Sequence, residues 1–381
     1  MKLPDQVIGP VKAQLALLGR APTAADVVEA LRRCGQVISD SAVLQVQQAV
    51  RRDSVGAGLL DPLVALPEVT DVLVNGPDRV YIDRGQGLEL TEIHFDSDEA
   101  VRQLATRLAA SVGRRLDDGS PFVDARLASG VRVHAVLGTL ASPGTCLSLR
   151  VPAAQQLTLD DWTRLGSLDQ AAADLIRRLV AARAAILVSG GTGSGKTTLL
   201  SALIALIDPG QRIVVVEDSL ELDPDHPHLV RLESRPANAE GFGLITMADL
   251  IRQALRMRPD RIIVGEVRGG ELTDLLRALN TGHEGGCATV HANSLTDVPA
   301  RLEALAALGG LDRQAAQAQI GAAIDVVIHI ARQGRLRQVC EIGLLRRDDS
   351  GMVKAVPAWS LEDGRPRRWP GLAELERRLA P

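Results

Sequence analysis

Residues 190–198 combine glycines, a lysine and hydroxyl side chains at a spacing typical of phosphate binding. Gly190, Gly195, Lys196 and Thr197 fit the pattern G-x-x-x-x-G-K-[ST]. Because glycine has no Cβ, the backbone N–H groups of such a loop can surround a phosphate. We expect Lys196 to reach the β- and γ-phosphates of ATP and the Thr197 hydroxyl to ligate Mg²⁺. The candidate nucleotide-binding residues are Gly190, Gly191, Thr192, Gly193, Ser194, Gly195, Lys196, Thr197 and Thr198.

The residues on either side of this loop place it between a strand and a helix. An apolar run precedes it at 184–189, and a strongly helical run follows it as far as 208–210. The start of that helix adds free N–H groups and a positive dipole end for an anion. A chance match in a chain with 35 glycines is the alternative, which this context disfavours.

Carboxylates follow an apolar run at residues 213–222, which read IVVVEDSLEL. We expect Glu217, Asp218 and Glu221 to lie at the end of a strand, on the same sheet edge as the glycine-rich loop. A carboxylate beside Mg-ATP can orient or deprotonate the attacking water. Simple solvation of a strand end is the alternative, and these residues alone leave it open.

A second acidic strand end occurs at residues 261–271, which read RIIVGEVRGGE. An apolar strand that ends in an acid has the form of a Walker B motif, but Gly265 occupies the usual aspartate position and Glu266 follows it. This spacing suits a direct or water-mediated contact of Glu266 with Mg²⁺. Arg268 has the choice of a phosphate or an acid as its partner.

Two histidines flank a short apolar run at residues 281–294, which read TGHEGGCATVHANS. Because this stretch follows the glycine-rich loop and the acidic strand, we interpret His283 and His291 as sensors of the γ-phosphate or as orienters of the acids. Zinc binding is the competing interpretation, but no third soft ligand lies at a suitable spacing.

Composition bounds the class of protein. The chain has 381 residues, 46% of them hydrophobic and 24% charged, which predicts a globular protein of two or three domains. A net charge of −4 and only 2% aromatic residues give no general reason to bind nucleic acid. No apolar run is long enough to span a bilayer and no signal peptide is visible, so we expect a cytoplasmic protein. The four separated cysteines are expected to be buried small side chains.

Periodicity divides the chain into parts of different character. Residues 1–55 read as a helical segment, with a capping box at Thr23 and Asp26 and a second helical stretch at about 40–52. Residues 56–150 read as an α+β domain with a hairpin at 71–85 and a helix that starts at Asp96. Residues 151–167 read as a linker. Residues 168–381 alternate apolar runs with helices, which predicts an α/β domain with a mostly parallel sheet, followed by short strands and a terminal helix.

The order of these stretches resembles that of the secretion ATPase superfamily, which powers type II and type IV secretion and type IV pili. The stretches VTDVLVNGPDRVYIDRG, GRRLDDGSPFVDARLASGVRVHAV and LSLRVP are similar to the Tad/Flp pilus-assembly branch. The resemblance covers roughly residues 60–335. It implies a RecA-like C-terminal domain, a cytoplasmic homohexamer that hydrolyses ATP with Mg²⁺, and an inner-membrane platform protein as partner.

The resemblance also implies individual roles. Glu217 would be the general base or water orienter and Glu266 the acid on the Mg²⁺ side. Arg132 and Arg150 match the arginines that reach the phosphates when two domains close, although both could equally be surface charges. The implied catalytic residues are Glu217, Glu266, His283, His291, Arg132 and Arg150.

The resemblance is not complete, and it leaves alternatives. Residues 137–139 read LGT where relatives often carry prolines, and the four-cysteine zinc module of many type II secretion ATPases is missing. The expected function is a hexameric motor for Tad/Flp pilus assembly. The alternatives are a conjugation or DNA-export ATPase of the same superfamily, and a scaffold that binds nucleotide and changes shape with little turnover.

Overall fold

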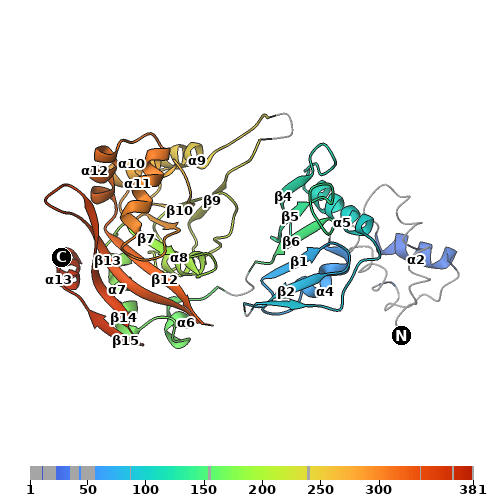
Figure 1. Ribbon diagram of the computed structural model, residues 1–381, viewed down its shortest axis with the longest axis horizontal. Helices are drawn as coiled ribbons and strands as arrows, with labels where there is room; N and C mark the ends of the chain where they lie inside the picture. The colour runs from blue at the N-terminus through green and yellow to red at the C-terminus, as the bar shows by residue number, and fades with distance from the viewer. Residues whose placement is uncertain are drawn as a thin grey trace. The chain divides into compact units, whose positions relative to one another are not determined.

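In a computed structural model of the chain, the structure describes residues 11, 23–34, 43, 56–85, 87–152, 156–237, 241–334, 336–362 and 364–379. The chain divides into two compact units, Met1–Ala154 and Gln155–Pro381, each with its own sheet (Figure 1). Apart from residue 43, the second helical stretch predicted at about 40–52 lies outside the described residues. Within the described part of the chain, no helix is both long and apolar enough to cross a membrane.

Unit 1 is built on a six-stranded antiparallel sheet in the order β3-β2-β1-β6-β5-β4. The predicted hairpin is confirmed, since the first two strands pair antiparallel. The alternation predicted for the later strands is also confirmed, because Val133 and Ala135 are buried while His134 between them is exposed. The strands are β1 (Asp71–Asn75), β2 (Val80–Asp83), β3 (Leu88–Leu90), β4 (Phe122–Arg126), β5 (Arg132–Val136) and β6 (Cys146–Arg150).

Helices of unit 1 follow the predicted capping signals with one shift. Thr23 and Asp26 form the expected capping box of the first helix. The long helix is capped by Ser97, one residue after the predicted start at Asp96, because the Ser97 hydroxyl accepts the N–H of Ala100. The helices are α2 (Ala24–Arg33), the 3₁₀ turn η1 (Gly58–Leu60), α4 (Asp61–Val64) and α5 (Asp98–Ser111).

Unit 2 contains a nine-stranded mixed sheet in the order β15-β14-β13-β12-β7-β11-β10-β8-β9. The strands from β12 to β9 in this order pair in parallel, and the last three along the chain extend the sheet antiparallel. The strands are β7 (Ile186–Gly190), β8 (Ile213–Glu217), β9 (Leu229–Glu233), β10 (Arg261–Val267), β11 (Cys287–Val290), β12 (Val326–Gln333), β13 (Leu336–Arg347), β14 (Val353–Glu362) and β15 (Arg365–Arg368).

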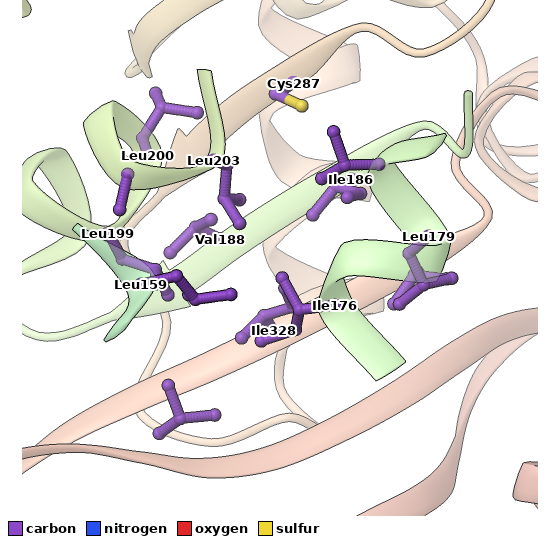
Figure 2. Close-up of a cluster of buried hydrophobic side chains, with 14 of the residues drawn as sticks. Leu159, Ile176, Leu179, Ile186, Val188, Leu199, Leu200, Leu203, Cys287 and Ile328 are labelled. Carbon is purple, nitrogen blue, oxygen red and sulfur yellow. The ribbon is translucent and has the colours of Figure 1, made fainter. Parts of the chain in front are cut away.

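Helices cover both faces of this sheet, so its central strands are buried on both sides. Ile186 and Val188 of β7 pack in one core, which Figure 2 shows. Leu187 between them packs in the core on the other face. This burial explains the continuous apolar runs in the sequence. The helices are α6 (Leu159–Arg164), α7 (Gln170–Ala181), α8 (Lys196–Ile204), α9 (Met247–Ala254), the 3₁₀ turn η2 (Leu255–Met257), α10 (Leu272–Asn280), α11 (Val298–Leu308), α12 (Arg313–Ala323) and α13 (Gly371–Leu379).

Three details differ from the expectations. The stretch 151–167, expected as a linker, contains α6, and its Trp162 is only 2% exposed in the core of unit 2. The strands after Ala331 are not short, since β13 has 12 residues and β14 has 10. Among the four cysteines only Cys287 is buried, so the expectation for the other three is wrong.

Candidate functional site

The glycine-rich loop leaves the central strand β7 and opens into α8, as the sequence predicts. Gly195 caps the helix at φ +100°, a conformation that favours glycine. At Gly190, a Cβ would lie 2.2 Å from the carbonyl oxygen of Ile330 on the neighbouring strand β12. The loop therefore needs glycine for a turn at one end and for a close backbone approach at the other.

Lys196 lies against this loop and is 7% exposed. Its Nζ donates to the carbonyl oxygens of Gly190 (3.1 Å) and Gly191 (2.8 Å). Burial lowers the pKa of Lys196, and the negative charge of Glu266 opposes that effect. The ammonium group is thus held at the mouth of the loop, beside the free N–H groups of the α8 N-terminus, where an anion is stabilised.

Glu217 ends β8 and is almost completely buried, at 2% exposed. Its Oε1 accepts the backbone N–H groups of Glu221 and Leu222, both at 2.9 Å, while its Oε2 is buried without a hydrogen-bond partner. Burial raises the pKa of Glu217 to about 7, against the two backbone donors that lower it. A carboxyl group with a pKa near neutrality is suited to accept a proton at physiological pH.

The side chain of Glu217 explains why residue 265 is glycine rather than aspartate. A Cβ at residue 265 would lie 2.7 Å from the Cγ of Glu217, on the neighbouring parallel strand. The space that an aspartate side chain would take at this position is therefore filled by Glu217. The backbone of Gly265 is also fixed from the other side, since the buried Thr289 hydroxyl donates to its carbonyl oxygen at 2.7 Å. The sequence argument missed Thr289.

Glu266 and His291 meet in front of Lys196. Oε1 of Glu266 lies 2.5 Å from Nε2 of His291, in a contact that is not aligned as a hydrogen bond, and Nδ1 of His291 lies 3.4 Å from Nζ of Lys196. Burial lowers the pKa of His291, and the charge of Lys196 lowers it further. A neutral ring can accept from the ammonium at Nδ1 and present its proton at Nε2 to the carboxylate.

Arg268 joins the two acidic strand ends. One of its terminal nitrogens lies 2.6 Å from Glu266 and the other 2.9 Å from Asp218, next to Glu217. Of the two partners left open by the sequence, Arg268 takes acids in this structure. The carboxylates of β8 and β10 are thereby held together at the sheet edge that carries the glycine-rich loop.

The residues around the glycine-rich loop fit Mg²⁺ and a nucleoside triphosphate. Oε1 of Glu266 is a buried carboxylate oxygen without an aligned hydrogen bond, and carboxylate oxygen is a preferred ligand of Mg²⁺. Thr197 is half-buried in the first turn of α8. When bound, Mg²⁺ would neutralise charge on the phosphates and supply a Lewis acid.

His283 lies elsewhere. It precedes β11, whose first residue Cys287 is the register partner of Ile186 at the start of β7. A Cβ on the nearby Gly285 would lie 3.1 Å from the Cα of Arg183, just before that strand. His283 is therefore at the amino edge of the parallel strands, opposite the glycine-rich loop. Within this unit His283 therefore lies away from the glycine-rich loop and the acids, whereas His291 lies beside them.

Arg132 and Arg150 belong to unit 1 and are directly opposite each other on β5 and β6. Arg126 on β4 is the register partner of Arg132, so three arginines from adjacent strands form a row on one face of the sheet. Asp71 on β1 continues the row and lies 3.3 Å from the Arg150 guanidinium. Nε of Arg126 is buried without a hydrogen-bond partner. Arg126 was missed because strand register is not visible in the sequence.

The geometry defines an α/β protein whose glycine-rich loop lies between a central parallel strand and a helix, beside acidic strand ends. The type II/IV secretion system protein family matches residues 53–363, and the chain belongs to this family. A Mycobacterium tuberculosis protein named as a conjugal transfer protein is 52% identical over 338 residues, which cover 86% of this chain and 95% of that protein.

Two more distant proteins are similar to the chain, one in sequence and one in fold alone. Conjugal transfer protein TrbB of Rhizobium radiobacter is 35% identical over 298 residues, which cover 76% of this chain and 88% of TrbB. The crystallographic structure of the Legionella pneumophila ATPase DotB is similar in fold, with a TM-score of 0.51 and 19% identity over 74% of this chain and 78% of DotB.

Proposed function

We propose that the chain is a Mg²⁺-dependent ATPase that drives a secretion-type machine from the cytoplasmic side of the membrane. The observation that carries the proposal is the meeting of Lys196, His291 and Glu266 beside the buried carboxyl group of Glu217. A binding module needs the lysine and the loop, but it has no need for a buried acid with a pKa near neutrality. This acid therefore favours a hydrolase over a nucleotide-switched scaffold.

In the proposed reaction, Glu217 orients the attacking water and accepts its proton at Oε2. Lys196 gives up its hydrogen bonds to the loop carbonyl oxygens and binds the β- and γ-phosphates. His291, which lies between Glu266 and the ammonium group, holds both in position. Thr197 and Glu266 are the proposed Mg²⁺ side of the site. Arg132 and Arg150 are proposed to stabilise charge on the transferred phosphoryl group, supplied by unit 1 of the same or of a neighbouring copy.

The test is ATP turnover by the purified chain and three variants. We expect Lys196→Ala to lose nucleotide binding and turnover together. Glu217→Gln and Glu266→Gln should keep nucleotide binding and lose turnover, with the general-base variant slower by ~10²-fold or more. Turnover that persists in both glutamine variants would overturn the assignment of the acids.

Assembly is proposed to be a closed homohexamer that works on an inner-membrane platform protein. Light scattering with Mg²⁺ and a non-hydrolysable ATP analogue should then show six times the chain mass of 40.5 kDa. A monomer under saturating nucleotide would contradict a ring that forms without its membrane partner.

The kind of machine has two candidates. The stretches in unit 1 that resemble the Tad/Flp branch favour pilus assembly, whereas the names of the relatives from Mycobacterium tuberculosis and Rhizobium radiobacter favour conjugal transfer. The net charge of −4 agrees better with a protein substrate than with DNA. Turnover that rises on addition of single- or double-stranded DNA would decide for DNA export, and unchanged turnover would favour pilus assembly.

A further inference from the structure

A buried polar pair links the strand that enters the glycine-rich loop to the neighbouring strand. Nδ1 of His329 on β12 is 2.9 Å from the hydroxyl of Ser189 on β7, and the two residues are 5% and 0% exposed. They are register partners in the parallel pairing of these strands. On the same face of the sheet, Leu187 and Val327, each two residues earlier, are apolar and buried, so the pair interrupts an otherwise apolar layer. Buried polar groups of this kind are costly unless each is satisfied.

The pair connects the two segments that build the site. Ser189 directly precedes Gly190, whose carbonyl oxygen accepts from Lys196. The ring of His329 also lies close enough to the backbone of Asn293, two residues after His291, for that backbone to act on the pKa of the ring. One imidazole thus joins the strand that enters the glycine-rich loop to the segment that carries His291.

We propose that His329 is a positioning residue that holds His291 between Lys196 and Glu266 by fastening the backbone at Asn293 to Ser189. The inference rests on the proposed ATPase function, because a misplaced His291 matters for turnover rather than for folding. His291 lies 3.4 Å from Lys196 and 2.5 Å from Glu266, distances that a small shift of residues 291–293 would change.

Histidine suits this position because its two ring nitrogens point to opposite sides. Nδ1 faces Ser189, which leaves Nε2 for Asn293. Burial lowers the pKa of His329, the charge of Lys196 lowers it further, and Asp297 and the Asn293 backbone oppose the effect, so the ring stays neutral. A neutral ring can bridge two partners without burying a charge beside Lys196.

The first experiment is a double-mutant cycle with His291. We expect His329→Phe, which fills the space without either polar contact, to lower kcat by about tenfold while the nucleotide Kd stays within twofold. In a His291→Ala background the same substitution should have almost no further effect, because His329 acts through His291. Equal losses in both backgrounds would show a merely structural role and would overturn the proposal.

Two conservative substitutions separate the partners of the ring. Gln reaches the position of Nε2 and keeps the link to Asn293, whereas Asn reaches the position of Nδ1 and keeps the link to Ser189. His329→Gln should therefore retain more turnover than His329→Asn, and the reverse order would contradict the proposed route through Asn293. His228→Gln, which changes an exposed histidine of the same unit, should leave kcat unchanged and serves as the control.

A second measurement does not depend on turnover. The rate at which diethyl pyrocarbonate modifies His291, read by peptide mass spectrometry, should rise severalfold in His329→Phe because the ring is no longer held. An unchanged rate would refute the positioning role even if the chain hydrolysed no ATP. An inactive wild-type chain in which the rate rises as expected would count against the proposed ATPase function alone.

Discussion

The side chain of Glu217 covers the Cα of Gly265 so closely that a Cβ at residue 265 would lie 2.7 Å from the Glu217 Cγ. Glu217 is the last residue of β8, and Gly265 lies within the neighbouring parallel strand β10. One strand therefore lacks the expected acid because the neighbouring strand supplies a larger one to the same space. Glu217 and Gly265 are therefore a packed pair, and a substitution at either residue should alter the position of the other.

Gly265→Ala is the direct test of this relationship. The added methyl group would displace Glu217 without removing its carboxylate, so we expect turnover to fall by ~10²-fold while nucleotide binding is retained. ATP turnover and nucleotide Kd are the measurements. Gly210→Ala adds the same methyl group in an exposed turn, where only the Asp208 carboxylate lies nearby, and should be neutral. Equal activity of the two variants would contradict the packing argument.

The pH dependence of turnover should follow the ionisation of Glu217. As the proposed base it must be deprotonated, and burial raises its pKa to about 7. We therefore expect kcat to rise with pH between about 6 and 8 and to level off above. Nucleotide Kd measured over the same range provides the control. A kcat that is independent of pH from 5.5 to 8 would exclude Glu217 as the base.

Stability should show the opposite trend at this residue. The folded-state pKa of about 7 is above the ordinary value of 4.5, so the protonated form is favoured by folding and this contribution is lost as the pH rises through 7. Glu217→Gln removes the buried charge, and at pH 8 it should be more stable than the wild type by up to about 3 kcal/mol. The difference should vanish near pH 4, and thermal unfolding of the nucleotide-free chains would measure it.

Arg150→Ala should reduce turnover more than nucleotide affinity. In the proposed role the guanidinium acts on charge that develops in the transition state, so kcat should fall by ~10³-fold with a small change in Kd. Arg84→Ala removes another exposed arginine of unit 1, whose Nε is 3.9 Å from the Glu89 carboxylate, and should have no effect. An equal loss of kcat in both variants, or no loss in Arg150→Ala, would show that Arg150 is only a surface charge.

Trp162→Ala tests the assignment of α6 to the core of unit 2. Trp162 is 2% exposed and belongs to the same hydrophobic core as the buried side chains of α8. Its ring lies 3.4 Å from a Cβ built on Gly195. Truncation should cost about 3–5 kcal/mol of unfolding free energy. Trp162→Phe should recover more than half of that loss. A linker residue would show neither effect in urea unfolding.

The parallel strands and the loop could be predicted from sequence because their physics is local. Strands buried on both faces must be apolar throughout, and a strand–loop–helix segment with glycine at Gly195 has few other conformations. The capping box at Thr23 and Asp26 also forms as predicted. β9 escaped prediction because Leu229–Glu233 is a half-exposed edge strand with Arg231 at its centre, so it shows no apolar run.

Long-range pairing explains what could not be predicted. His329 sits in an apolar run, and its partner Ser189 is 140 residues away in the chain. The row of Arg126, Arg132 and Arg150 depends on the register of three strands, which no local pattern encodes. The sequence interpretation gave His283 and His291 a shared role, but the strand between them carries the two histidines to opposite edges of the sheet.

The antiparallel extension of the second sheet limits how far the chain can be truncated at its C-terminal end. Val339 and Ile342 of β13 and Trp359 of β14 belong to the same core as Val188 and Leu199 beside the glycine-rich loop. A polypeptide that ends after residue 331 would lack these side chains, so part of that core would be exposed to water. The edge of β12 that pairs with β13 would also be open to pairing with another molecule. Such a shortened version, although it retains every motif of the site, should precipitate on expression.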